Sequence, residues 1–131
     1  MGDKSSDDSW KNGLDIIDKV YGAGASAIMH GLENQPFVAE TVQHLFGEIW
    51  SRPGLSMRDK RLLVLGATAT LGRPDLIAIQ VAGAIVNGEL TEEQLAEIPL
   101  LMMFYAGAGN ATAIHQGIQA AKAKAKDMKP A

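Results

Sequence analysis

The sequence predicts one all-α domain of about six helices. Apolar residues recur at three- and four-residue spacings along most of the chain of 131 residues, which is the spacing that lines one face of a helix. Proline, glycine and an Asn-Gly pair interrupt that pattern at the intervals that short turns need. No stretch alternates between apolar and polar residues as a half-buried strand does. The length is that of one domain, which we expect to span residues 9–127.

The N-terminal part of the chain predicts two helices. We expect residues 1–8 to form a disordered acidic tail, because three aspartates and one lysine lack apolar partners there. A helix with one apolar stripe follows over residues 9–21, and the segment 25–35 after it is ambiguous. Pro36 opens a second long helix. That helix ends at the turn 52–54, because proline disfavours helical geometry in the residue before it.

Four more helices are predicted from their start signals, each a capping residue or a helix-opening proline: Ser56 with Asp59, Pro74, Thr91 with Gln94, and Asn110. The helix after Ser56 is apolar nearly all round, so we expect it to be the most buried. Asn87-Gly88 and Gly107 end the next two helices. The last helix ends in alternating lysines that complement its dipole, and we expect these to be solvated without a ligand.

The composition excludes several classes of protein. The formal net charge is −3, so no overall positive field attracts nucleic acid or a membrane surface, and we predict neither partner. The first nine residues, MGDKSSDDS, fit neither a secretory signal nor a transit peptide, which predicts a cytoplasmic protein. The apolar stretch 98–109 is shorter than the roughly 20 residues that span a bilayer, and we interpret it as a buried helix.

The chain contains no cysteine, which excludes disulfides, thiolate nucleophiles and cysteine-ligated metal sites. His30 and His115 are isolated and lack the spacing of paired metal ligands. We therefore predict no metal and no cofactor.

Two charged residues on the second helix are candidates for catalysis. Glu48 lies among apolar residues, and burial against their rings would raise its pKa and suit it to acid–base chemistry. His44 lies one turn earlier, so its ring could reach Glu48 and form a relay. The alternative is a solvated surface pair. Tyr105 could direct its hydroxyl into a pocket or be a buried aromatic residue with a satisfied hydroxyl.

Two blocks of sequence resemble a known family. Residues 46–56, FGEIWSRPGLS, followed by RDKRL at 58–62, are similar to the G-E-x-W-x-R-P-G-L block of carboxymuconolactone decarboxylases. Asp75-Leu76, the stretch 84–97 and Tyr105-Ala106-Gly107 resemble the family's downstream motifs. The resemblance spans about residues 10–120 and implies the all-α, alkylhydroperoxidase D-like fold. Since there is no cysteine, the thiol peroxidases of that superfamily are excluded.

The resemblance also implies a reaction and roles for further residues. Decarboxylation of a β-carboxy γ-lactone expels CO₂ and protonates carbon, so it needs a proton donor. The family carries a histidine on the helix before the Asn-Gly turn, and this chain has Gln80, which donates hydrogen bonds but cannot shuttle protons. Arg52 is expected to hold a substrate carboxylate, whereas Arg61 could pair with Glu48 and be structural. The expected substrate-binding residues are Arg52, Gln80, Trp50 and Tyr105.

Two functions remain open. The first is a carboxymuconolactone decarboxylase-like enzyme that decarboxylates or isomerises a small carboxylated lactone or β-keto acid by general acid–base chemistry. The second is a non-catalytic, oligomeric binding or accessory protein on the same fold. Many small residues and the run Met102-Met103-Phe104 leave apolar surface to cover, so we expect a homo-oligomer, and the family implies a trimer or hexamer.

Overall fold

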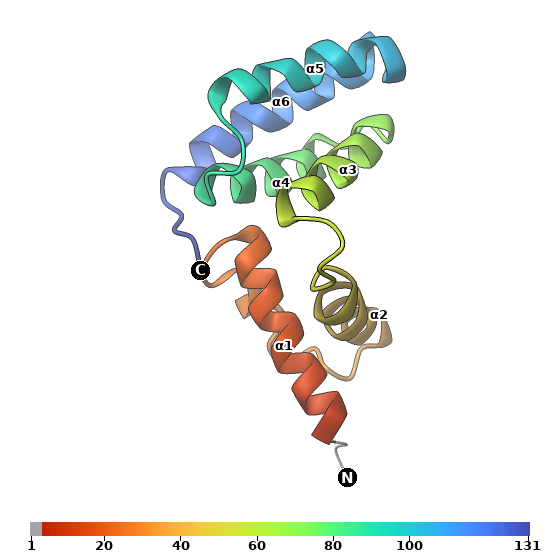
Figure 1. Ribbon diagram of the computed structural model, residues 1–131, viewed down its shortest axis with the longest axis vertical. Helices are drawn as coiled ribbons and strands as arrows, with labels where there is room; N and C mark the ends of the chain where they lie inside the picture. The colour runs from red at the N-terminus through yellow and green to blue at the C-terminus, as the bar shows by residue number, and fades with distance from the viewer. Residues whose placement is uncertain (1–3) are drawn as a thin grey trace.

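The computed structural model describes residues 4–131, with side chains from residue 7 onward, and over that range it is helical without strands (Figure 1). The helices are α1 (Lys4–Tyr21), η1 (Ala25–Met29), α2 (Pro36–Glu40), η2 (Thr41–Ile49), α3 (Met57–Thr70), α4 (Pro74–Val86), α5 (Glu92–Ala106) and α6 (Ala108–Ala125). Helix η1 is a 3₁₀-helix, and η2 is a π-helix that continues α2 without a break. The predicted all-α class is confirmed.

Apolar side chains are buried in two clusters, which correspond to the lower and upper parts of Figure 1. The first cluster lies between α1 and the helix formed by α2 and η2, and it contains Trp10, Ile17, Val20, Val38, Val42, Phe46 and Trp50. The second lies among α3 to α6, and it contains Leu65, Ala69, Ile77, Val81, Ala82, Ala84, Leu90, Leu95, Ile114, Ile118 and Ala121. Two buried polar side chains, Arg61 and Gln80, lie between the two clusters.

Two glycines let α1 and η2 approach each other at backbone distance. A Cβ atom added to Gly13 would lie 1.9 Å from the carbonyl oxygen of Val42, and one added to Gly47 would lie 3.1 Å from that of Ser9. Asn12 Nδ2 also donates to the Gly47 carbonyl at 2.8 Å. A larger side chain at Gly13 therefore requires the two helices to separate.

The predicted caps are confirmed at two helices and wrong at a third. Ser56 accepts a hydrogen bond from the backbone of Asp59 at 3.0 Å, and Thr91 and Gln94 form a reciprocal capping box. Helix α6 begins at Ala108, before the predicted cap Asn110, whose side chain donates to the carbonyl of Ala106 instead.

The start of α1, the relative burial of α3 and α4, and the burial of α5 differ from the predictions. Helix α1 begins at Lys4, so the predicted tail is helical from there, and residues 1–3 lie outside the described range. Helix α4 is more buried than α3, because α4 packs against α1 as well as against α3 and α6. The second half of α5 was expected to be buried, yet Phe104 is 79% and Tyr105 82% exposed. Within residues 4–131 no helix has the length and apolarity needed to cross a membrane.

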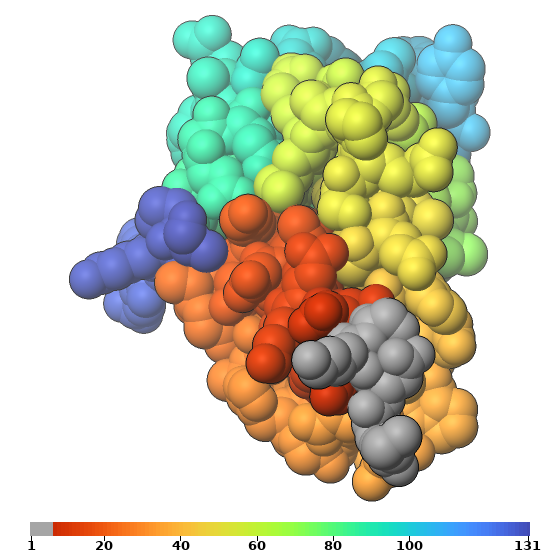
Figure 2. Space-filling view, turned by 60° about the horizontal axis from the view of Figure 1, so that its bottom comes forward, coloured from red at the N-terminus to blue at the C-terminus, as the bar shows by residue number. Residues whose placement is uncertain are grey.

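The C-terminal segment closes back onto the loop after α1. In Figure 2 this segment lies beside the loop, and the backbone of Ala23 donates to the carbonyl of Lys129 at 2.8 Å. Met128 packs beside Gly22 as a result. The end of the chain thereby forms part of the wall of a cavity near Tyr21.

Candidate functional site

A buried ion pair joins α3 to the turn after α4. Arg61 has no exposed surface, and its Nε and Nη2 each donate to one carboxylate oxygen of Glu89 at 2.8 Å. Asn87 Nδ2 donates to the same carboxylate at 3.0 Å and to the backbone carbonyl of Lys19 at 2.7 Å. The structural role expected for Arg61 is present, but its predicted partner Glu48 is wrong, because Glu89 occupies that position.

Gln80 extends this network from the ion pair to α1. Arg61 Nη1 donates to Gln80 Oε1 at 3.2 Å, and Gln80 Nε2 donates to the Tyr21 hydroxyl oxygen at 3.0 Å. Gln80 is 6% exposed. The Glu89–Arg61–Gln80–Tyr21 network therefore links the two apolar clusters by a continuous line of hydrogen bonds.

Gly83 makes room for the network on α4. A Cβ atom there would lie 2.2 Å from the Val20 carbonyl oxygen and 2.8 Å from Arg61 Nη1. Only a hydrogen atom fits at this position, so α1 and α4 can enclose the guanidinium from two sides.

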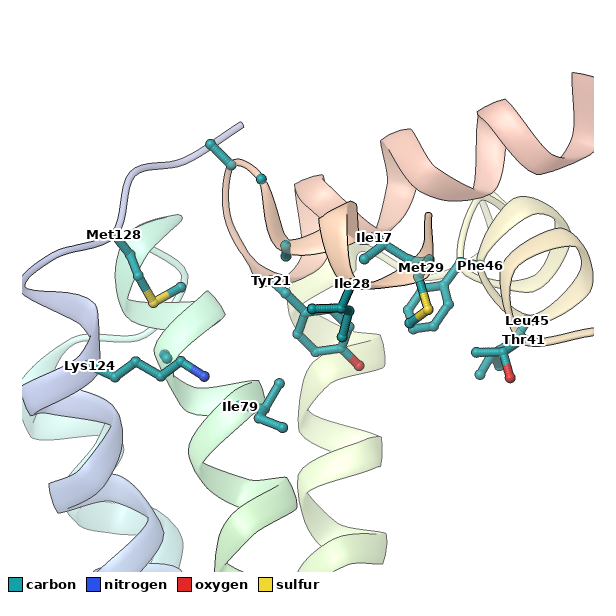
Figure 3. A pocket seen from close by; sticks show the side chains of 14 residues that line it. Ile17, Tyr21, Ile28, Met29, Thr41, Leu45, Phe46, Ile79, Lys124 and Met128 are labelled. Carbon is teal, nitrogen blue, oxygen red and sulfur yellow. The ribbon is translucent and has the colours of Figure 1, made fainter. Parts of the chain in front are cut away.

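The Tyr21 cavity has a volume of about 590 Å³ and lies beside the end of this network (Figure 3). Its walls are almost entirely apolar and come from α1, η1, η2, α4, α6 and the C-terminal segment; the larger lining side chains are Ile17, Tyr21, Ile28, Met29, Leu45, Phe46, Ile79, Lys124 and Met128. Lys124 extends from α6 toward the side on which Tyr21 and Ile79 lie (Figure 3). One cation and one phenol in an apolar cavity suit a small, partly apolar anion.

The environment of Tyr21 changes the acidity of its hydroxyl. Burial raises the pKa of Tyr21 above its ordinary value, while the charge of Arg61 and the hydrogen bond from Gln80 act in the opposite direction. The hydroxyl is therefore neutral near pH 7 and retains its hydrogen.

A second pocket, the Arg52 pocket, lies on the other side of Leu45 and measures about 640 Å³. Leu45 lines both cavities, and Arg52 and Trp50, two predicted substrate-binding residues, line the second one. Lys60 in its wall donates to the backbone carbonyls of Trp50 and Arg52. The structure thus brings Arg52 and Trp50 together, but it does not bring them together with Gln80.

Glu48 and His44 lie on the exposed face of η2 and line neither cavity. Glu48 is 61% exposed, and its Oε1 lies 3.8 Å from His44 Nε2. The apolar surroundings expected for Glu48 are absent. His44 Nδ1 also contacts the carboxylate of Glu40, and that hydrogen bond is the main cause of a raised pKa for His44. Glu40, His44 and Glu48 therefore form a surface cluster in which each residue lies one helical turn from the next.

Tyr105 is the predicted site residue furthest from its expected setting. It stands near the end of α5, 82% exposed, and lines neither the Tyr21 cavity nor the Arg52 pocket. Within one subunit its hydroxyl therefore enters neither cavity and its ring is not buried. This ring belongs to the exposed apolar surface of α5.

Comparison with known proteins identifies the family. The sequence model of the carboxymuconolactone decarboxylase family matches residues 35–122. The chain is also 31% identical, over 103 residues, to the 4-carboxymuconolactone decarboxylase of Acinetobacter baylyi, a match that covers 75% of each chain. This chain belongs to the carboxymuconolactone decarboxylase family. Three of the four network residues, Glu89, Arg61 and Gln80, lie within the matched residues, whereas Tyr21 precedes them.

Three residues of the site were not found from the sequence. Tyr21 was assigned to the apolar stripe of the first helix, because a tyrosine in such a stripe gives no sign of where its hydroxyl points. Glu89 directly follows the Asn-Gly turn, and a lone acidic residue in a turn is ordinarily solvated. Lys124 was assigned to the solvated helix end, and only the tertiary packing of α6 brings it to the cavity.

Proposed function

We propose that this member of the carboxymuconolactone decarboxylase family binds a small carboxylated lactone or β-keto acid in the Tyr21 cavity and decarboxylates or isomerises it. The observation that carries the proposal is the buried contact of Gln80, where the family is expected to have histidine, with a hydroxyl in the cavity wall. The Acinetobacter relative is a decarboxylase of 4-carboxymuconolactone, which supports a carboxylated lactone as the substrate class.

The groups of the cavity suit the steps of such a reaction. The bond from carbon to carboxylate breaks, CO₂ leaves, and the electron pair passes to the conjugated carbonyl until one proton, taken from solvent in the wild type, adds to carbon. Apolar walls remove water from the carboxylate and strengthen every remaining polar contact. Lys124 attracts the anion, and the Tyr21 hydroxyl can donate to an oxygen on which charge develops.

Turnover of 4-carboxymuconolactone by the purified protein tests this proposal, followed as CO₂ release and as the change in ultraviolet absorbance. We expect slow turnover by the wild type. Gln80 does not itself line the cavity, so a histidine there would act through the Tyr21 hydroxyl that it contacts. We expect Gln80→His to be faster by about 10²-fold or more, since general acid–base catalysis contributes roughly 10²–10⁴ in rate. Histidine can keep both contacts of Gln80, accepting from Arg61 with one ring nitrogen and donating to Tyr21 with the other.

A folded Gln80→His variant with no more activity than wild type, together with a wild type that fails to bind the lactone, would falsify the proposed reaction. Binding without turnover in both proteins would favour the second function, a non-catalytic binding protein. One observation favours that outcome: the residues that line the Tyr21 cavity include neither a carboxylate nor an imidazole.

The Arg52 pocket is a second location for the substrate carboxylate. The Arg52 side chain has no hydrogen bond or ion pair within residues 7–131, and Trp50 offers an aromatic surface beside it. Affinity for the stable saturated lactone 5-oxotetrahydrofuran-3-carboxylate separates the two locations. We expect Lys124→Gln to weaken its binding by about tenfold, as for a charge-assisted contact, and Arg52→Gln to leave it unchanged. The reverse result assigns the substrate to the Arg52 pocket.

We also propose that the protein is a homo-oligomer, as a trimer or hexamer. Exposed apolar side chains gather on the second half of α5, where Leu100, Leu101, Met103, Phe104 and Tyr105 are 42% to 82% exposed. Surface of this kind is normally covered by another subunit. Sedimentation of the protein at micromolar concentration tests the proposal, and a monomer there contradicts it.

A further inference from the structure

The direction of each hydrogen bond in the buried network is determined by chemistry. A guanidinium has hydrogens to donate and no acceptor. The Gln80 atom that faces Arg61 Nη1 must therefore be the carbonyl oxygen, which leaves the amide nitrogen facing Tyr21. That nitrogen can only donate, so the Tyr21 oxygen is the acceptor in their 3.0 Å contact.

This direction leaves the hydrogen of the Tyr21 hydroxyl available. Its oxygen is occupied by Gln80, and residues 7–131 supply no acceptor for its hydrogen. The ring of Tyr21 lines the cavity together with Phe46 and Ile79, which have no acceptor to offer. An uncommitted donor on a largely buried phenol is costly to leave unpaired, which favours a ligand that presents an acceptor there.

We propose that Tyr21 is the hydrogen-bond donor of the cavity, and that Glu89, Arg61 and Gln80 are positioning residues that hold its hydrogen toward the ligand. The ligand presents a carbonyl, enolate or carboxylate oxygen to Tyr21. The ligand class rests on the proposed function, whereas the orientation of the hydroxyl rests on the network alone.

Glutamine at position 80 keeps the same donor and acceptor at every pH, whereas a histidine there would not. A neutral histidine has one donor and one acceptor nitrogen, and protonation would turn both into donors facing Arg61 and Tyr21. Glutamine does not titrate, so the donation to Tyr21 persists at every pH at which Arg61 and Glu89 stay paired. Gln80 in this chain therefore fixes the direction of the Tyr21 hydroxyl and transfers no proton itself.

Carbon-13 NMR of protein labelled at tyrosine Cζ tests the orientation without any ligand. The sequence contains two tyrosines, and the exposed Tyr105 serves as the internal reference. Because the bond from Gln80 favours the phenolate, we expect Gln80→Met to raise the pKa of Tyr21 further. Arg61 is the charged group that acts on this phenol, and Lys124 is the charged residue that lines the same cavity. An unchanged or lowered pKa of Tyr21 in a folded Gln80→Met variant means that Tyr21 donates to Gln80, and it overturns the proposal.

Binding of 5-oxotetrahydrofuran-3-carboxylate, measured by calorimetry, tests the role of the hydroxyl. We expect Tyr21→Phe to weaken binding about tenfold, the usual effect of losing one hydrogen bond to an anion, while the matched Tyr105→Phe leaves it unchanged. Equal affinities of Tyr21→Phe and wild type contradict the proposal. If wild type does not bind this probe at millimolar concentration, the ligand class of the proposed function fails, and the NMR measurement still decides the orientation of Tyr21.

Discussion

Replacing Glu89 by glutamine should destabilise this protein far more than an ordinary surface substitution. Glutamine keeps the shape of the side chain and removes its negative charge. Arg61 would then carry an uncompensated charge at a position without exposed surface. Both of its donors to the carboxylate, at 2.8 Å each, would face a weaker acceptor, and the contact from Asn87 would weaken as well.

The magnitude follows from the burial of the pair. Removal of one partner from a buried ion pair costs about 3–5 kcal/mol. Unfolding entropy is about 2.1 cal/mol/K per residue, so 1 kcal/mol lowers Tm by about 3.6 °C in a chain of this length. We therefore expect Glu89→Gln to lower Tm by about 11–18 °C.

Thermal and urea unfolding followed by circular dichroism measure this loss, at several protein concentrations because subunit association also stabilises the folded state. Glu92→Gln is the matched control, since Glu92 forms an ion pair with Lys122 in which its side chain is 80% exposed. A surface pair contributes at most about 1 kcal/mol, so the control should keep a Tm within about 4 °C of wild type. Similar stabilities of the two variants would refute the idea that the buried pair stabilises the contact between α3 and the turn after α4.

Three further predictions concern single positions. Gly83→Ala should lower the free energy of unfolding by about 1–3 kcal/mol, because the added Cβ would lie 2.2 Å from the Val20 carbonyl oxygen. Gly66→Ala in α3 is the control: its Cβ would have no neighbour within 4 Å, so denaturant unfolding should show an unchanged or raised stability. The pKa of His44, read by NMR, should exceed its ordinary value of about 6.5 and fall in Glu40→Gln; stability from this pair is present at low pH and lost as pH rises through the folded-state pKa. Glu48→Gln should leave lactone turnover within about twofold of wild type, since Glu48 is exposed and outside the cavity, and a loss comparable to that of a catalytic group, about 10² or more, would restore its predicted role.

The helical class and most helix boundaries could be predicted because their signals are local. Ser56 and Thr91 cap their helices through contacts three residues away, and Pro36 and Pro74 fix the first turn of theirs. The π-helical form of η2 could not be predicted, since it accompanies a backbone contact with Gly13 some 30 residues earlier. Burial was misjudged for α3 and α5 for a related reason: apolarity shows that a face will be covered, but not by which helix or by which subunit.

The candidate site was harder to predict than the fold, because its contacts join residues far apart in sequence. Gln80 was found from the family resemblance, but its partners Tyr21 and Arg61 lie 59 and 19 residues away. Glu48 and His44 were predicted from helical spacing, and they do lie one turn apart, yet spacing along one helix does not reveal whether the face is buried. Chemistry at this site depends on which helices meet at the boundary between the two clusters, and that is decided by tertiary packing.

The central claim is that the Tyr21 cavity is the substrate site, and a crystal structure of the protein with 5-oxotetrahydrofuran-3-carboxylate tests it most directly. We predict density for the lactone between Tyr21, Phe46 and Ile79, with one oxygen within hydrogen-bond distance of the Tyr21 hydroxyl and the carboxylate toward Lys124. Density for the lactone beside Arg52 and Trp50, with the Tyr21 cavity empty at the same ligand concentration, would contradict it.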